Sequence, residues 1–342
     1  MHEIAMIGRG KVEAIEPARY RLEDFPEVRT LRRRRDEMRG RGLSMPYFRV
    51  QEGISRDSTV IAGRHYLNFS SHNYLGLSGD PEVTRAAAHA AIRYGTSVSA
   101  SRIASGERAV HRELEAALAR FLGCEDAIAL VSGHATNVSV LGHLLGPEDL
   151  IVHDALAHDS ILGGARLSGA RRRPFAHNDM DALEDILATT RPEARRVLIA
   201  VEGVYSMDGD LAPLDRLIEL KRKYKAILLV DEAHSLGVVG RTGRGIGEHY
   251  RVDRGDVDLW MGTLSKSLAS CGGTSPVRRP SWTTPSIRRQ GSFPAWASRR
   301  RMPRRRWRPC RSWRRGPISS PASGPGAGCS STCAAIAGSP PG

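Results

Sequence analysis

AILLVDEAH (residues 226–234) and DLWMGTLSKS (residues 258–267) decide how this chain folds. Each segment begins with a short apolar run and ends in polar residues, which is typical of a buried strand that delivers functional side chains at its end. The first run ends at Asp231, and His234 follows three positions later. The second run leads into a turn that carries Lys266.

Similar strands alternate with helices along the chain. Apolar runs of strand length recur at 127–131, 150–154 and 197–204. Apolar residues at helical spacing lie at 81–94, 107–122 and 214–224. This alternation predicts an α/β fold in which helices cover both faces of a mostly parallel sheet. Ligands of such sheets bind at the carboxyl ends of the strands, where the polar residues of the quoted segments fall.

Asp231 and Lys266 together suit pyridoxal 5′-phosphate (PLP). This cofactor needs an amine for its aldehyde, a carboxylate for its pyridine nitrogen, and hydroxyl and amide groups around its phosphate. Burial lowers the pKa of a lysine, which keeps its amine neutral and reactive. The alternative interpretations are a surface lysine in a loop and an aspartate that caps a helix. The neighbouring DEAH run and Thr263 favour the cofactor site.

Eight short motifs occur in the order found in the α-oxoamine synthases, a branch of the fold-type I PLP enzymes. They are NYLGL (73–77), SRIASGERAVHRELE (101–115), SGHATN (132–137), HDALAHDSI (153–161), HND (177–179), EGVYSMDGDLAPL (202–214), VDEAH (230–234) and TLSKS (263–267). The chain resembles this family, which includes 8-amino-7-oxononanoate synthase, 2-amino-3-ketobutyrate CoA ligase and serine palmitoyltransferase. The resemblance implies an N-terminal helical arm (1–64) and a partial PLP-binding large domain (65–273).

The resemblance also implies roles around the cofactor ring. Lys266 would bind the aldehyde of PLP and remove the α-proton of the bound amino acid. Asp231 would pair with the pyridine nitrogen, His234 and Ser206 would contact the phenolic oxygen, and His158 would stack on the ring. These are the catalytic and ring-binding residues that we expect.

A second group would hold the phosphate and the substrate. The backbone amides of Gly133 and His134 lie at an expected helix start, which favours an anion. Thr263 and Ser265 would add hydroxyl groups, and Asn73 would lie near the substrate carboxylate. Relatives usually carry an aromatic residue in place of His134.

The implied reaction joins an amino acid to an acyl thioester of coenzyme A or of a carrier protein, with loss of carbon dioxide. A homodimer is expected from the same resemblance. One alternative is a class I/II aminotransferase, which shares Asp231 and Lys266. Another is a non-enzymatic fragment whose basic tail binds nucleic acid, although we do not expect nucleic acid as a partner.

The composition changes after Gly273. Residues 274–342 contain 14 arginines but no lysine, acid or leucine, so the net charge of +14 belongs to this tail. We interpret 274–342 as an out-of-frame, disordered segment that replaces the small C-terminal domain of the family, including its arginine for the substrate carboxylate. We therefore expect little activity from the chain as printed.

The remaining features point to a cytoplasmic protein. No apolar run is long enough to span a membrane, and the N-terminus does not resemble a secretory signal. The five cysteines are sparse, which fits a reducing compartment. Their spacing predicts no zinc site, and we expect no metal. His153 and His177 are expected to be ordinary structural residues.

Overall fold

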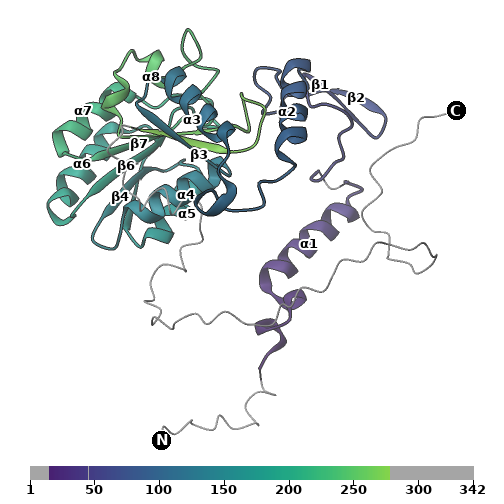
Figure 1. Ribbon diagram of the computed structural model, residues 1–342. Coiled ribbons are helices and arrows are strands. Elements are labelled where there is room, and N and C mark those ends of the chain that lie inside the picture. The colour runs from purple at the N-terminus through teal and green to yellow at the C-terminus, as the bar shows by residue number, and fades with distance from the viewer. Residues whose placement is uncertain (1–14, 45, 278–342) are drawn as a thin grey trace, which may run out of the picture. The chain divides into compact units, whose positions relative to one another are not determined.

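The computed structural model describes residues 15–44 and 46–277 (Figure 1). The N-terminal part contains one long helix, α1 (Pro26–Gly40), with no buried residue. A two-stranded antiparallel sheet follows, made of β1 (Ser58–Ile61) and β2 (Arg64–Leu67). Helix α2 (Pro81–Tyr94) begins at Asp80, whose side chain accepts hydrogen bonds from the backbone of Glu82 and Val83. Helix α1 carries the arginine-rich run RTLRRRRDEMRG and, with no buried residue, is a solvated helix.

A seven-stranded sheet forms the centre, with the strand order β3-β9-β8-β7-β6-β4-β5. Its strands are β3 (Asp126–Leu130), β4 (Leu150–Asp154), β5 (Arg171–Phe175), β6 (Val197–Glu202), β7 (Ile227–Asp231), β8 (Leu259–Thr263) and β9 (Gly273–Val277). The five strands from β8 to β5 run parallel. Strand β9 runs antiparallel to both β3 and β8. The sheet is thus mostly parallel, as predicted.

Helices cover both faces of this sheet. They are α3 (Ala109–Leu122), α4 (Gly133–Leu144), α5 (Asp159–Ser168), α6 (Met180–Thr190), α7 (Leu214–Tyr224) and the short α8 (Ile246–His249). Buried side chains of α6 and α7 pack with one face of the parallel strands, and those of α4 and α5 pack with the other. This arrangement confirms the predicted α/β fold.

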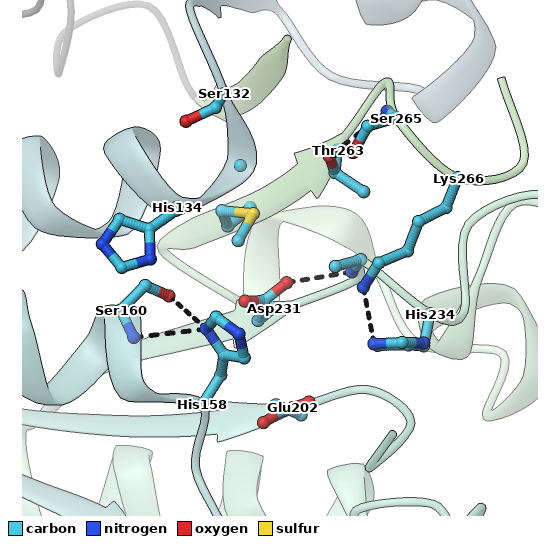
Figure 2. Close-up of a pocket in the computed structure, with 13 residues that line it drawn as sticks. Ser132, His134, His158, Ser160, Glu202, Asp231, His234, Thr263, Ser265 and Lys266 are labelled. Carbon is cyan, nitrogen blue, oxygen red and sulfur yellow. Dashed lines mark hydrogen bonds between the residues drawn. The ribbon is translucent and has the colours of Figure 1, made fainter. Parts of the chain in front are cut away.

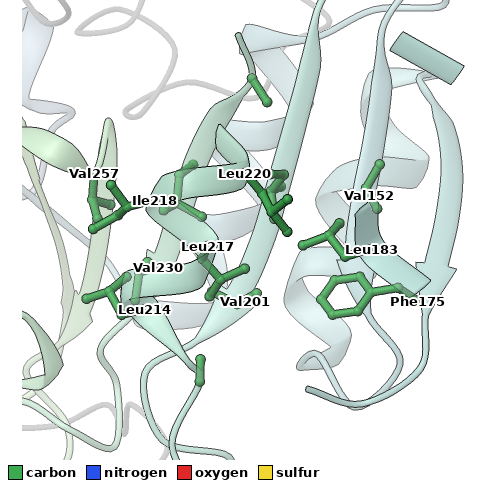
Figure 3. Close-up of a cluster of buried hydrophobic side chains, with 14 of the residues drawn as sticks. Val152, Phe175, Leu183, Val201, Leu214, Leu217, Ile218, Leu220, Val230 and Val257 are labelled. Atoms are coloured by element: carbon green, nitrogen blue, oxygen red, sulfur yellow. The ribbon is translucent and has the colours of Figure 1, made fainter. Parts of the chain in front are cut away.

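Side chains point alternately to the two faces along each strand, and they form one hydrophobic core on each face of the sheet. Val152 of β4 packs in the α6–α7 core with Val201 and Val230 (Figure 3), whereas its neighbour Ile151 packs in the α4–α5 core. Neighbouring side chains of a strand point to opposite faces, so strands buried on both sides are apolar throughout. Burying one such side chain contributes about 1.5–3 kcal/mol. The two cores fix the strand ends, and with them the polar residues that follow.

The structure differs from the expectation at two strands. Strand β5 carries three arginines and a proline, and its sequence has no apolar pattern. It lies at the edge of the sheet, where a strand tolerates exposed and proline residues. Strand β9 continues four residues past the predicted boundary at Gly273.

Our interpretation of the tail from residue 278 onward lies outside the described residues. In the part of the chain that is described, no helix is both long and apolar enough to cross a membrane.

Candidate cofactor site

A cavity of about 220 Å³ lies where strands β6, β7 and β8 end and helices α4 and α5 begin. It contains eight of the predicted site residues. These are Gly133, His134, His158, Asp231, His234, Thr263, Ser265 and Lys266. The strand ends and the helix starts bring together residues that are more than a hundred positions apart in the sequence (Figure 2).

Asp231 is the buried acid of the cavity. It ends β7, and its side chain accepts hydrogen bonds from the Asn137 side-chain amide at 2.8 Å and the Ala233 backbone amide at 2.9 Å. Asn137 lies on α4, is fully buried, and also donates to Ser160 at 3.0 Å. Burial raises the pKa of Asp231, while these hydrogen bonds and the Lys266 charge act in the opposite direction. Asn137 therefore holds the carboxylate in place.

Lys266 lies on the loop after β8 and is half-buried. Its Nζ atom is 2.5 Å from Nε2 of His234 (Figure 2). Burial lowers the pKa of Lys266, against the attraction of Asp231 and Glu202. Burial, together with the positive charge of Lys266, also lowers the pKa of His234 to about 4. At neutral pH the imidazole of His234 is therefore uncharged beside the lysine amine.

The other nitrogen of His234 has a partner that the motifs did not reveal. Nδ1 of His234 is 2.8 Å from the Tyr74 hydroxyl. Tyr74 belongs to the predicted NYLGL motif, yet the sequence analysis selected Asn73 from that motif.

His158 is the N-cap of α5 and faces the cavity. Its Nδ1 accepts a hydrogen bond from the Ser160 backbone amide at 3.2 Å and lies 2.7 Å from the Ser160 hydroxyl. These contacts fix the ring plane (Figure 2). The His134 ring lies edge-on to it, with centroids 6.2 Å apart.

The start of α4 and the end of β8 meet at the other side of the cavity. A Cβ atom on Gly133 would lie 3.0 Å from the Thr263 side chain, so a larger residue would crowd this place. The Thr263 and Ser265 hydroxyls are 2.7 Å apart. A helix start with free amides and two hydroxyls is a suitable place for a phosphate. The amine, the buried carboxylate and this polar end fit the parts of PLP.

Glu202 is a cavity residue that the sequence analysis missed. It ends β6 and is the direct register partner of Asp231 on β7. The side chain is 4% exposed. Burial and the neighbouring Asp231 charge raise the pKa of Glu202 to about 8. Its place at a strand end, at the start of the EGVYSMDGD run, is the signal that could have identified it.

Asn73 and Ser206 do not line this cavity. The Asn73 amide donates to the Ser55 backbone oxygen at 2.9 Å, and its side-chain oxygen accepts from the Ser78 backbone at 2.9 Å. Both ends of the side chain are thus used to hold its loop. Ser206 is exposed in a turn closed by the Gly209 amide and the Tyr205 carbonyl. Their predicted contacts with substrate and cofactor stay predictions.

His153 and His177 lie outside the cavity lining. Nδ1 of His177 is 2.9 Å from Asp154, and its Nε2 is 2.8 Å from Asp210. Burial lowers the pKa of His177, but the hydrogen bonds to both carboxylates outweigh it and raise the pKa overall. Nδ1 of His153 is 2.8 Å from the Asp154 backbone oxygen. Within the described residues, no cluster of three or more acid, histidine or cysteine side chains could hold a metal ion.

Known proteins are similar to this chain in sequence and in fold. The 8-amino-7-oxononanoate synthase of Geobacter sulfurreducens is 45% identical over 236 residues, which cover 69% of this chain and 60% of that protein. The solved serine palmitoyltransferase of Sphingomonas wittichii has a TM-score of 0.74 at 34% identity, covering 79% of this chain and 68% of that one. A second serine palmitoyltransferase structure, solved with PLP, has a TM-score of 0.74 at 32% identity, covering 79% and 68%.

The chain thus spans about three fifths of the length of the curated relative. The model of the family described as aminotransferase class I and II matches residues 64–278, which is more than half of the chain. These residues include the whole cavity and both cores. The chain therefore belongs to the aminotransferase class I and II family and is similar, within it, to 8-amino-7-oxononanoate synthases and serine palmitoyltransferases.

Proposed function

We propose that this chain carries the cofactor site of a PLP-dependent C-acyltransferase of the α-oxoamine synthase type. The reaction would join an amino acid to an acyl thioester, with loss of carbon dioxide. The observation that carries the proposal is that Lys266 and Asp231 line one cavity, together with a helix start and paired hydroxyls. The similarity to 8-amino-7-oxononanoate synthase and serine palmitoyltransferase supports this choice within the family.

Each cavity residue then has a task set by its surroundings. When bound, PLP supplies an electron-withdrawing ring that stabilises negative charge on the α-carbon of an attached amino acid. Asp231, held by Asn137, would keep a proton on the ring nitrogen. The half-buried Lys266 would supply a neutral amine and carry the α-proton. His158, fixed by Ser160, would cover one face of the ring.

The remaining groups would bind the phosphate. The Gly133 and His134 amides would point at it from the start of α4, because a helix N-terminus attracts anions. Thr263 and Ser265 would turn their hydroxyls from each other to the phosphate oxygens. The partners of the whole protein would be an amino acid, an acyl-CoA or acyl carrier protein, and a second copy of the chain, in the cytoplasm.

The first test is cofactor binding. Adding PLP to the purified chain should produce a visible absorption band, and Lys266→Ala should abolish it because no amine remains for the aldehyde. Borohydride reduction followed by peptide mass analysis should place the cofactor on Lys266. Lys223→Ala is the matched control, since Lys223 lies on the surface and pairs with Glu184. A band that persists in Lys266→Ala would contradict the proposal.

The second test separates the acyltransferase from an aminotransferase. Incubation with an amino acid and an acyl-CoA should release free thiol only when both are present. Conversion of the amino acid to a keto acid without thiol release would instead identify an aminotransferase. Binding to nucleic acid that weakens steeply with salt would point to the basic tail as the functional part.

A further inference from the structure

Three groups from separate segments form one hydrogen-bonded row beside the cavity. The Tyr74 hydroxyl lies 2.8 Å from His234 Nδ1, and His234 Nε2 lies 2.5 Å from the Lys266 amine. Tyr74 comes from the loop between β2 and α2, His234 follows β7, and Lys266 follows β8. The His72 ring packs edge-on against His234, with centroids 6.0 Å apart. The row ends at the amine expected to hold PLP.

The imidazole in the middle of this row can take only two hydrogen-bonding arrangements. A neutral imidazole carries one N–H group and one acceptor nitrogen. His234 is neutral at physiological pH, because burial and the facing groups Lys266, His72 and His158 all lower its pKa. The proton therefore sits on either Nδ1 or Nε2, and the partner of Nδ1 selects between them.

Tyr74 is suited to make that selection. Its phenol keeps its proton at neutral pH, since burial raises its pKa above the usual value. A phenol is a better hydrogen-bond donor than acceptor, because the ring withdraws electron density from its oxygen. Donation from Tyr74 to Nδ1 leaves the imidazole proton on Nε2, where the lone pair of the neutral lysine amine can accept it.

We propose that Tyr74 is a positioning residue, which donates its hydroxyl hydrogen to Nδ1 of His234 and thereby presents an Nε2–H group to the cavity. The chain sets this protonation site wherever Lys266 carries no positive charge, because an ammonium group has no lone pair and could only donate to Nε2. Its use rests on the proposed function, in which this N–H would donate to the anionic phenolic oxygen of PLP. The opposite tautomer would offer that oxygen a lone pair and repel it.

The test reads the tautomer in cofactor-free Lys266→Ala protein, where no ammonium group donates to Nε2. Two-bond ¹H–¹⁵N correlation spectra distinguish protonated from bare imidazole nitrogens, and His234→Asn identifies the signals of His234. We expect the Nε2–H form in Lys266→Ala and loss of this preference when Tyr74→Phe is added. Tyr66→Phe is the matched control. Tyr66 lies on β2, and this substitution removes a hydroxyl that does not contact His234. An Nδ1–H form in Lys266→Ala, or an unchanged tautomer after Tyr74→Phe is added, would overturn the inference.

A second measurement tests whether the tautomer affects the binding of PLP. Tyr74→Phe should weaken PLP binding by about 2–10-fold, which corresponds to the loss of one ordinary hydrogen bond. Tyr66→Phe should leave the affinity unchanged. Equal affinities of the native chain and Tyr74→Phe would contradict the use that we assign to the N–H. If the native chain bound no PLP, the proposed function would fail, while the spectra would still decide the role of Tyr74.

Discussion

Two carboxyl groups share the floor of the cavity. Glu202 and Asp231 are paired in register on adjacent parallel strands, and both are almost completely buried. Like charges this close disfavour double ionisation, so one group retains a proton. Asp231 has two hydrogen-bond donors that stabilise its anion, which makes Glu202 the neutral member near pH 7. Together the two carboxyl groups then carry one negative charge, which would pair with the one ring nitrogen of PLP.

Glu202→Gln should make the stability of the protein less sensitive to a rise in pH between about 5 and 8. The folded pKa of Glu202 is about 8, above the usual 4.5, so the native state holds a proton that the unfolded chain has already released. Stability is therefore lost as pH rises from about 5 to 8. Glutamine cannot ionise. We therefore expect the free energy of unfolding of Glu202→Gln to rise by on the order of 3 kcal/mol relative to that of the native chain over that pH range. Urea unfolding at several pH values measures this.

Exposed Glu219→Gln is the control for this series, since it removes the same charge from the surface. The same pH dependence in native and Glu202→Gln protein would show that Glu202 is ionised when folded.

Asn137→Ala should weaken PLP binding. The substitution removes a hydrogen bond to the buried Asp231 anion, and such bonds contribute about 1.5–3 kcal/mol. This predicts an affinity loss of about 10–100-fold in a spectrophotometric titration. Asn68→Ala, which removes an asparagine outside the cavity lining, should bind normally. Native affinity in Asn137→Ala would show that Asp231 needs no support from α4.

Standing in a recognisable motif was not enough to identify a site residue, because Tyr74 and Asn137 belong to the quoted motifs NYLGL and SGHATN and were still missed. Asp231, His234 and Lys266 were identified from short runs, and they do lie in one cavity. Asn137 and Tyr74 matter only through partners 94 and 160 positions away. Contacts of that kind depend on how the strands and helices pack, which local patterns do not encode.

At the level of elements, helices α4 and α5 pack closely against each other near the site. A Cβ atom on Gly164 would lie 2.7 Å from the Asn137 backbone oxygen and 2.8 Å from the Leu141 side chain. The adjacent Gly163 has more room, with its nearest neighbour, Val138, at 3.5 Å. Gly164 therefore lets α5 approach the helix that carries Gly133 and Asn137.

Gly164→Ala should destabilise the protein by about 1–3 kcal/mol, because the added methyl group must push α4 and α5 apart. Gly163→Ala adds the same methyl group in open space and should be neutral or slightly stabilising, since alanine favours a helix. Chemical unfolding of the two variants measures the difference. Equal free energies of unfolding for the two variants would mean that α4 and α5 can move apart without loss of stability.

Most elements followed from the sequence because their apolar spacing is regular. Helices α2 and α7 have the predicted bounds, 81–94 and 214–224. Strand β5 was not predicted because an edge strand needs few apolar residues. Strand β9 was not predicted because the change in composition begins inside this strand.

At the scale of the whole molecule, large apolar side chains remain exposed in the N-terminal part. They include Phe48 (98% exposed), Phe69 (93%), Val50 (78%) and Leu67 (76%). Exposed apolar surface of this kind favours association. We therefore propose this surface as the place where a second copy of the chain would bind.

Analytical ultracentrifugation should therefore find a dimer. Phe69→Asp should shift the population toward monomer, because a charge at an apolar contact must be desolvated. Met207→Asp is the control, since Met207 is equally exposed but lies in the turn after β6. A monomer at all concentrations, or equal effects of both substitutions, would show that this surface is not the interface.

The position of strand β9 in the sheet determines which strands would unfold locally together. Within the described residues it is the only strand that joins β3 to the parallel strands. Its first residue, Gly273, also packs so closely on the start of α4 that an added Cβ would lie 2.2 Å from Thr136. Fraying of β9 would therefore release β3 and the phosphate end of the cavity, while β6 and β7 stayed closed. Deuterium uptake should then rise together in β3 and β9, well before the strands that carry the two acids begin to exchange.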